Sequence, residues 1–234
     1  MPLRKLLFSV TAALLVGLGT ATVRADEIYF SEPTSAQGTG FGTVLTVLTL
    51  HATPNESGSV SWNGATDVRT GHATNQSQTY SFTQLINSGI ENAGSIGLVF
   101  NSDETGPVPN SNFLDSLTLN VYNNTTGALV YSVSLRPSDA GDDYPTVEQG
   151  IGGSGYLFLL DAGAQASLNA FFLNNPSFRI GLSAAVTGSD NGPDTFYIVD
   201  VNTPVPEPTT MLLLGTGLVG IAAKVRRRRR ADSE

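Results

Sequence analysis

The sequence predicts an all-β protein: an antiparallel β-sandwich or jelly-roll-like core with one short helix, flanked by an N-terminal signal peptide and a single C-terminal transmembrane helix. Three observations predict the core. Short runs of β-branched and aromatic residues alternate with glycine, serine, threonine and asparagine, and no helical stripe of apolar residues occurs before residue 162. The runs begin roughly 10 to 20 residues apart, a spacing typical of antiparallel sandwiches.

Ten segments of the chain are expected to form strands because each combines β-branched or aromatic residues with flanking turn residues. In chain order they are Glu27 to Phe30, Phe41 to Leu50, Ser59 to Trp62, Thr79 to Leu85, Ser95 to Phe100, Leu114 to Asn123, Leu129 to Leu135, Tyr156 to Asp161, Phe178 to Val186 and Thr195 to Val201.

The strongest local pattern is a hairpin. Apolar and polar residues alternate over 117–122 and again over 130–135, and Asn123-Asn124-Thr125-Thr126-Gly127 between them tolerates positive φ angles. One short helix is expected at Ala164 to Leu173, where apolar residues recur near helical spacing and Asn174-Asn175-Pro176 ends the run.

Both ends of the chain carry targeting segments. Arg4 and Lys5 precede an apolar stretch from Leu6 to Leu18, which predicts a cleaved secretory signal peptide over residues 1–25 and use of signal peptidase and the secretion machinery. Near the C-terminus, prolines 204, 206 and 208 forbid helix and predict an extended linker. The apolar run of about 209–225 then spans roughly 25 Å as a helix, slightly less than the ~30 Å hydrocarbon core.

Five consecutive arginines follow that apolar run and are expected to be its cytoplasmic anchor: Arg226, Arg227, Arg228, Arg229 and Arg230. Such a cluster stays cytoplasmic by the positive-inside rule, so the preceding domain is expected outside the inner membrane, with the N-terminus outside and the C-terminus cytoplasmic. An ordinary tail anchor with a proline stalk would have the same chemistry.

The order Pro206-Glu207-Pro208, apolar segment with glycines, and Arg226 to Arg230 resembles the PEP-CTERM sorting signal of Gram-negative bacteria, also described as an ice-binding protein C-terminal domain. This resemblance covers residues 204–230. It implies recognition by an exosortase, a membrane cysteine transpeptidase, followed by transfer to the cell envelope or the extracellular matrix. Segments 96–104, 155–161 and 179–183 are similar to all-β proteins of unassigned activity that carry the same signal.

The segment between the two targeting segments, residues 26–203, is expected to form one acidic domain. It holds three arginines and no lysine against seventeen acidic residues, a net charge of −14. Such a surface repels phosphate backbones, which excludes nucleic acid as a partner and favours divalent cations or cationic matrix components. Cysteine is absent, so the exported part has neither disulfides nor thiol catalysis.

Catalytic motifs are weak. His51 and His72 lack the spacing that would place two imidazoles on one metal, and they are expected on the surface or in loops. No serine lies in a GxSxG elbow. The segment 150–155 matches GxGxxG, but it opens a strand rather than a helix, so a glycine turn is expected there instead of a cofactor loop.

Three acidic pairs are candidates for glycosidic chemistry or for solvated loops: Asp103 with Glu104, Asp142 with Asp143, and Asp190 with Asp194. All three pairs lie among glycine, proline, asparagine and serine, which indicates loops. The segment 190–194 is nearest in composition to a calcium loop, so Asp190, Asn191 and Asp194 are candidate calcium ligands. No other cofactor is expected.

Two classes of function remain open. The first is a non-enzymatic surface or matrix protein associated with exopolysaccharide or biofilm, in which exposed tyrosines or Trp62 stack on sugar rings. The second is a polysaccharide-active enzyme that uses loop carboxylates. Two carboxylates converging in a concave, partly buried pocket would favour the enzyme.

Overall fold

The computed structural model describes residues 25–34, 44–104, 107–148, 154–190 and 192–202. The prediction of an all-β fold is confirmed in this part of the chain. In chain order the strands and α-helices are β1 (Glu27–Thr34), β2 (Val44–Leu50), β3 (Asn55–Trp62), β4 (Asp67–Gly71), β5 (Tyr80–Ser81), α2 (Phe82–Asn87), β6 (Ile96–Asn101), β7 (Phe113–Asn123), β8 (Leu129–Leu135), β9 (Asp142–Asp143), β10 (Gly155–Leu160), α3 (Ala162–Phe172), β11 (Phe178–Thr187) and β12 (Asp194–Asp200).

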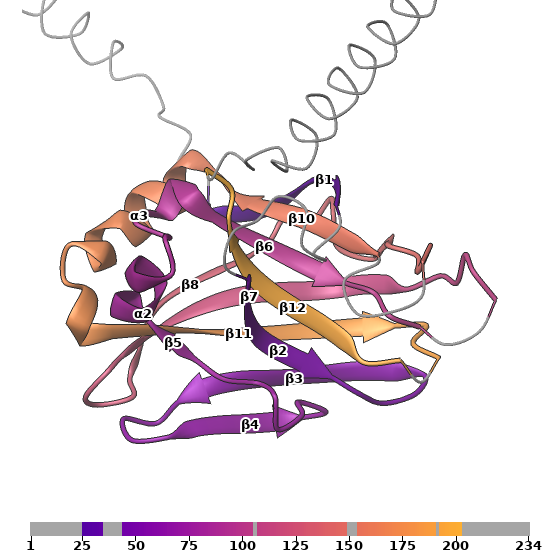
Figure 1. Ribbon diagram of the computed structural model, residues 1–234, viewed down its shortest axis with the longest axis horizontal. Coiled ribbons are helices and arrows are strands. Elements are labelled where there is room, and N and C mark those ends of the chain that lie inside the picture. The colour runs from indigo at the N-terminus through magenta and orange to yellow at the C-terminus, as the bar shows by residue number, and fades with distance from the viewer. Residues whose placement is uncertain (1–24, 35–43, 105–106, 149–153, 191, 203–234) are drawn as a thin grey trace, which may run out of the picture.

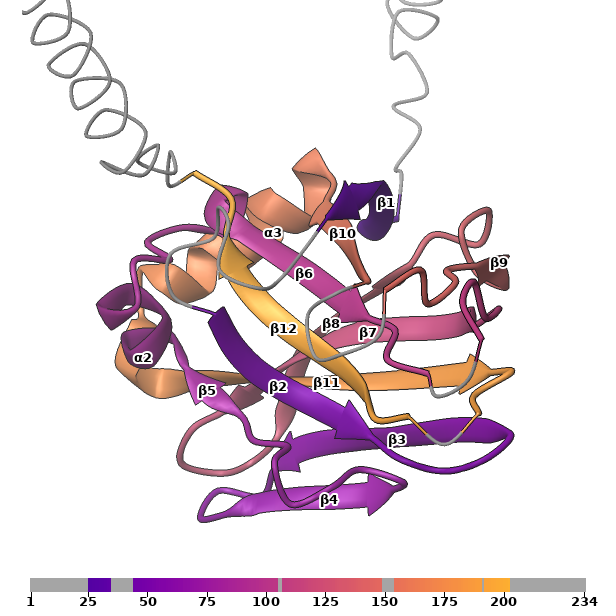
Figure 2. The same ribbon diagram turned by 45° about the vertical axis from the view of Figure 1, so that its right-hand side comes forward.

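The strands form one continuous sheet in the order β2-β12-β6-β10-β1-β8-β7-β11-β3-β4. The sheet folds over so that its two halves lie as two layers, with β2, β12, β6 and β10 in front of β8, β7, β11 and β3 (Figures 1 and 2). Most neighbours are antiparallel, but β1 and β8 pair in parallel at the fold between the layers. The helices α2 and α3 lie at one end of the layers.

The core fills the space between the layers. Its largest fully buried side chains come from both halves and from α2, and include Phe82, Phe100, Phe158 and Phe196. The rings of Phe100 and Phe196 stack with centroids 4.9 Å apart across the β6–β12 pair. Along β6, β10 and β12 every second side chain belongs to this core, while side chains between them form a second buried cluster of Val99, Leu157, Tyr197 and Val199. Residues that continue the first alternation past a strand end also point into the interior.

The predicted hairpin is confirmed. Strands β7 and β8 pair antiparallel with Leu119 opposite Val133. In the connecting turn, the Asn123 carboxamide oxygen accepts bonds from the backbone N–H groups of Thr125 and Thr126, both at 2.9 Å. Gly127 has a φ of +71°, which is the left-handed conformation that the sequence required of this turn.

The predicted helix is also confirmed, as α3, with Asp161 as its N-cap: the carboxylate accepts a bond from the Ala164 N–H at 2.8 Å. The predicted strand Thr79 to Leu85 was wrong over most of its length. Only Tyr80–Ser81 is a strand, and α2 follows, because Ser81 and Gln84 form a capping box in which each side chain bonds the other residue's backbone.

Candidate functional site: a buried carboxylate cluster and a neighbouring pocket

Three acidic side chains are almost completely buried at the end of the layers opposite the helices. Glu56 is 1% exposed, Glu104 is 1% exposed and Asp194 is 0% exposed. They come from β3, from the segment after β6 and from the start of β12, three elements that Figure 1 places at the same end. We call Glu56, Glu104, Asp194 and the buried Asn112 the carboxylate cluster.

Strand alternation explains why these side chains point inward. Asp194 precedes the core residue Phe196 by two positions, and Glu104 follows the core residue Phe100 by four. Glu56 is paired with the buried Val186 across β3 and β11. Glu104 lies in the loop after β6, as predicted, whereas Asp194 begins strand β12. Both side chains are buried, so the expectation of solvated carboxylates was wrong: the turn-like composition around them belongs to segments that continue the core face.

The Asn112 carboxamide is the centre of the cluster. Its nitrogen Nδ2 lies 3.0 Å from Ser102 Oγ, 3.1 Å from Glu104 Oε1, and 3.0 and 2.9 Å from the two carboxylate oxygens of Asp194. An amide nitrogen has two hydrogens, so it cannot satisfy four acceptors at once. Its own oxygen Oδ1 is buried without a hydrogen-bond partner among the described residues.

The remaining bonds of the cluster come mostly from backbone N–H groups. Glu104 Oε2 accepts bonds from the N–H of Asp190 and, at 3.4 Å, from that of Gly192. The Glu104 N–H itself donates to Thr146 Oγ1 at 3.0 Å. Asp194 Oδ1 accepts a long bond of 3.4 Å from the Asp103 N–H. These bonds attach the 190–194 segment to the segment that follows β6.

Glu56 is held separately. Its Oε1 accepts bonds from the Ala52 N–H at 2.6 Å and from Ser189 Oγ at 3.1 Å, while Oε2 is buried with no partner in the described part of the chain. Burial raises the pKa of Glu56 from 4.5 to about 7 against the opposing effect of these two bonds, and the charge of Glu104 raises it further.

Asp194 is affected in the same direction. Burial raises its pKa well above 3.8, the charges of Glu56 and Glu104 add to the rise, and the Asn112 bond opposes it.

The three arginines of the described ranges are all engaged away from the cluster. Arg136 pairs with Glu27, Arg179 lies over Trp62, and Arg69 donates to the Ser77 carbonyl. The segment 26–203 has no lysine. The cluster thus concentrates negative charge in an interior that no arginine or lysine of this part of the chain balances.

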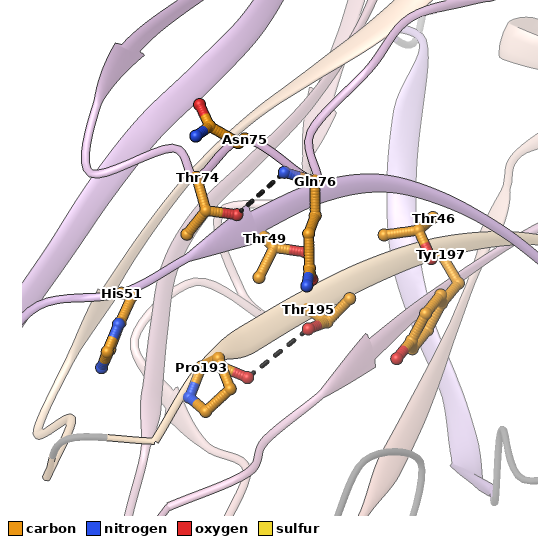
Figure 3. Close-up of a pocket in the computed structure, with 9 residues that line it drawn as sticks. All are labelled: Thr46, Thr49, His51, Thr74, Asn75, Gln76, Pro193, Thr195 and Tyr197. Carbon is orange, nitrogen blue, oxygen red and sulfur yellow. Dashed lines mark hydrogen bonds between the residues drawn. The ribbon is translucent and has the colours of Figure 1, made fainter.

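A pocket of about 550 Å³ lies beside the cluster, on the outer side of the β2–β12 pair. Figure 3 shows Thr195 and Tyr197 of β12 facing the loop that carries Thr74 and Gln76, with His51 near Pro193. Apart from His51 and Pro193, the lining side chains carry hydroxyl or amide groups, and none of the described lining residues has a carboxylate; the residues are Thr46, Thr49, His51, Thr74, Asn75, Gln76, Pro193, Thr195 and Tyr197.

The other sequence-predicted residues have structural roles. His51 and His72 are exposed, as expected, and His72 Nδ1 accepts a bond from the Ser57 N–H at 3.2 Å. Asp142 and Asp143 are exposed but form the short strand β9 rather than a loop, and Asp143 accepts a bond from the Asn112 N–H at 3.0 Å. Gly155 opens strand β10, as the glycine-turn interpretation requires.

Calcium binding by Asp190, Asn191 and Asp194 stays a prediction. Asp190 is exposed, Asp194 is buried, and Asn191 lies outside the described residues. Within the described ranges, no group of three or more His, Asp or Glu side chains is arranged to hold a metal ion.

Trp62 and the tyrosines are the rings that the sequence analysis expected to stack on sugars. Trp62 is half-buried: its Nε1–H donates to the Asn124 carbonyl at 2.8 Å, and the Arg179 guanidinium carbon lies 4.1 Å from the ring centroid. The expectation of exposed tyrosines was wrong, since all seven tyrosines, each in the described part of the chain, are buried or half-buried. Their rings complete the core or cover its edges.

Comparison with known protein families identifies the tail. Residues 204–229 match the PEP-CTERM protein-sorting motif. The chain is therefore an exported protein sorted by an exosortase. No curated protein and no solved structure matches the chain.

The predicted sorting and anchoring residues lie outside the described residues, as do the predicted signal peptide and the predicted membrane helix at about 209–225. They are Pro206, Glu207 and Pro208 of the sorting motif and Arg226, Arg227, Arg228, Arg229 and Arg230 of the cytoplasmic anchor. The matched motif includes all of these except Arg230, because it ends at residue 229. The cytoplasmic role of the arginines stays a prediction. Across the described ranges, no helix is long and apolar enough to cross a membrane.

Proposed function

We propose that the chain is a non-enzymatic surface or matrix protein, whose acidic β-sandwich domain over residues 26–203 is delivered by the tail and associates with exopolysaccharide. The sorting motif at 204–229 carries the delivery part of this proposal. After export, the precursor is anchored with its C-terminus in the cytoplasm until the exosortase processes it, and the domain then joins the cell envelope or the extracellular matrix.

Contact with polysaccharide is proposed at the pocket rather than through aromatic stacking. The pocket offers hydroxyl and amide groups from Thr74, Asn75, Gln76 and Thr195, which suit the hydroxyl-rich surface of a polysaccharide. The net charge of −14 limits the partner to a neutral or cationic polymer, or to an acidic one bridged by divalent cations.

The geometry supports a non-enzymatic surface or matrix protein over a polysaccharide-active enzyme. The carboxylates that converge are buried beneath the surface, and the pocket lining contains none. A glycosidase needs two carboxyl groups on either side of a bound sugar. One observation favours the polysaccharide-active enzyme: the raised pKa of Glu56 suits a general acid. New reducing ends released from the host's exopolysaccharide by the purified chain would establish the enzyme instead.

Delivery is tested by the intact mass and location of the protein in host cells with and without the exosortase. We expect loss of the tail near Pro206 only in the wild-type chain with exosortase present, and retention of the tail in a Glu207→Ala variant. A tail that persists in every strain would identify an ordinary tail-anchored protein and overturn the sorting step.

Polysaccharide association is tested by co-sedimentation of the full chain with exopolysaccharide purified from the same host. A double Asn75→Ala, Gln76→Ala variant, both exposed at the pocket, is expected to lose most of the bound fraction. The matched control is Ser116→Ala with Thr125→Ala, which removes two exposed polar groups elsewhere. Equal binding by all three proteins would refute the pocket as the contact.

A further inference from the structure

The pocket on the outer side of the β2–β12 pair has a floor made of four hydroxyl-bearing side chains. Thr46 and Thr49 come from β2, and Thr195 and Tyr197 come from β12. Thr195 lies opposite Thr49, as Figure 3 shows, and Tyr197 lies opposite Thr46. Opposite residues have Cβ atoms about 5 Å apart, and residues two apart along a strand are separated by about 7 Å. The four side chains of this floor therefore face one small area.

A β-bulge in β2 brings the two threonines of that strand to the same face. Leu48 and Thr46 pair with consecutive residues of β12, so Val47 between them is an extra residue. In a regular strand, residues three apart point to opposite faces of the sheet. Because of the bulge, Val47 and Leu48 both lie in the core, whereas Thr46 and Thr49 both line the pocket.

The hydroxyl group of Thr49 is buried without a partner. Thr49 is 2% exposed, and its Oγ1 has no hydrogen-bond partner among the described residues. The backbone of Thr49 is bonded: its N–H donates to Ser77 Oγ at 3.0 Å, and its carbonyl accepts a bond from the Thr74 N–H at 2.8 Å. A buried polar atom without a partner is destabilising. Because Thr49 lines the pocket, a ligand in the pocket can supply the missing bond.

The hydroxyl group opposite Thr49 is only weakly bonded. Thr195 is 5% exposed, and its Oγ1 donates to the Pro193 carbonyl at 3.4 Å. The usual length of an O–H···O bond is about 2.7–2.8 Å. Two adjacent hydroxyl groups that lack good partners suit a ligand with neighbouring hydroxyl groups of its own, because each such group both donates and accepts. A sugar residue has this chemistry.

The charges around the floor disfavour an acidic ligand. Apart from His51, the described lining residues have no group that can become positively charged. Burial raises the pKa of Tyr197, and the negative charge of Asp103 raises it further, so that charge acts at the floor. Asp194 directly precedes Thr195 and is buried on the other face of the same strand. An anionic sugar would enter a negative potential without an arginine or lysine to pair with in the described lining.

We propose that the pocket binds one neutral sugar residue, that a hydroxyl group of this residue bonds to Thr49 Oγ1, and that uronic acids are rejected. The volume of about 550 Å³ lies within the range of about 300–1,000 Å³ that is typical of small-molecule pockets. The inference rests on the polysaccharide association proposed above and narrows the partner to a polymer with neutral sugar residues.

The test is ligand-observed NMR of the full chain in a detergent without a sugar head group. The probes are glucose, galactose and mannose, each compared with its uronate, in which a carboxylate replaces the hydroxymethyl group. At least one hexose should bind, and its uronate should bind at least about 10-fold more weakly. Absence of hexose binding, or a uronate that binds as tightly as its hexose, overturns the proposal.

The diagnostic variant is Thr49→Val, which keeps the shape of the side chain and removes Oγ1. Its affinity for the hexose should fall roughly 2- to 12-fold, while its urea midpoint should not fall, because an unpartnered buried group has gone. Thr49→Ser restores the hydroxyl group and should regain affinity. Thr70→Val, at an exposed position of β4, should bind like the wild type.

A folded Thr49→Val that binds the hexose with wild-type affinity would assign Oγ1 to a buried water and overturn the proposal. If Thr49→Val does not fold, Tyr197→Phe, which removes another hydroxyl group of the floor, decides by the same criterion.

Co-sedimentation with the host's exopolysaccharide separates this inference from the function on which it rests. If a hexose binds but the chain does not co-sediment, the sugar site is supported and the association with exopolysaccharide fails. If the chain co-sediments but no hexose binds, the sugar site alone is overturned.

Discussion

The Glu56 carboxyl group should make the folded domain more stable at acidic than at neutral pH when no metal is present. Its pKa is about 7 in the folded protein and 4.5 without the burial, so the native state binds the proton more tightly. Between these two values the unfolded chain has lost its proton while the folded chain retains it. Stability therefore falls as the pH rises from about 4.5 to about 7 and stays low above it.

The size of the effect follows from the same pKa values. A rise from 4.5 to about 7 corresponds to a loss of at most about 3 kcal/mol. Asp194 adds to the loss with the same sign, because burial raises its pKa as well. The hydrogen bonds from Ala52 and Ser189 oppose the effect but do not cancel it.

The assay is urea unfolding of the full chain between pH 5 and pH 8 in chelator, for the wild type and for Glu56→Gln. The variant keeps an acceptor for the Ala52 N–H and removes the titrating group. We expect its stability to depend less on pH than that of the wild type, with the residual dependence due to Asp194, while exposed Asp142→Asn follows the wild type. Equal pH dependence for Glu56→Gln and the wild type would refute the assignment of the effect to Glu56.

Two further substitutions on β11, the second with a control variant, test contacts that hold the sheet together. Gly181→Ala should destabilise the domain by about 2–3 kcal/mol, because an added Cβ would lie 2.2 Å from the Val60 carbonyl oxygen. An unchanged urea midpoint would show that strands β3 and β11 can separate there without cost. Arg179→Met should cost about 1–3 kcal/mol, because it removes two hydrogen bonds to Thr79. The control Arg136→Met breaks a half-buried ion pair with Glu27 and should cost less than Arg179→Met. The reverse ranking by urea unfolding would contradict the role assigned to the Thr79 bonds.

Local sequence patterns predicted those parts of the fold whose causes are local. The β7–β8 hairpin depends on Asn123 and Gly127 within its own turn, and α3 depends on apolar spacing and the Asn-Asn-Pro stop. The α2 helix was missed although its signal is equally local: Ser81 and Gln84 form an S-x-x-Q capping box. The apolar residues Phe82 and Leu85 suit either a strand or a helix, and the cap decides between them.

Other features depend on contacts that no local pattern records. Strand β4 was not predicted because its residues, Asp67–Gly71, are mostly polar and exposed on an edge, where no apolar alternation is required. The parallel β1–β8 pair joins segments about a hundred residues apart. Composition alone could not indicate which acidic residues are buried. The alternation of side chains along a strand could, because Asp194 is two positions before the core residue Phe196 and therefore lies on the same face.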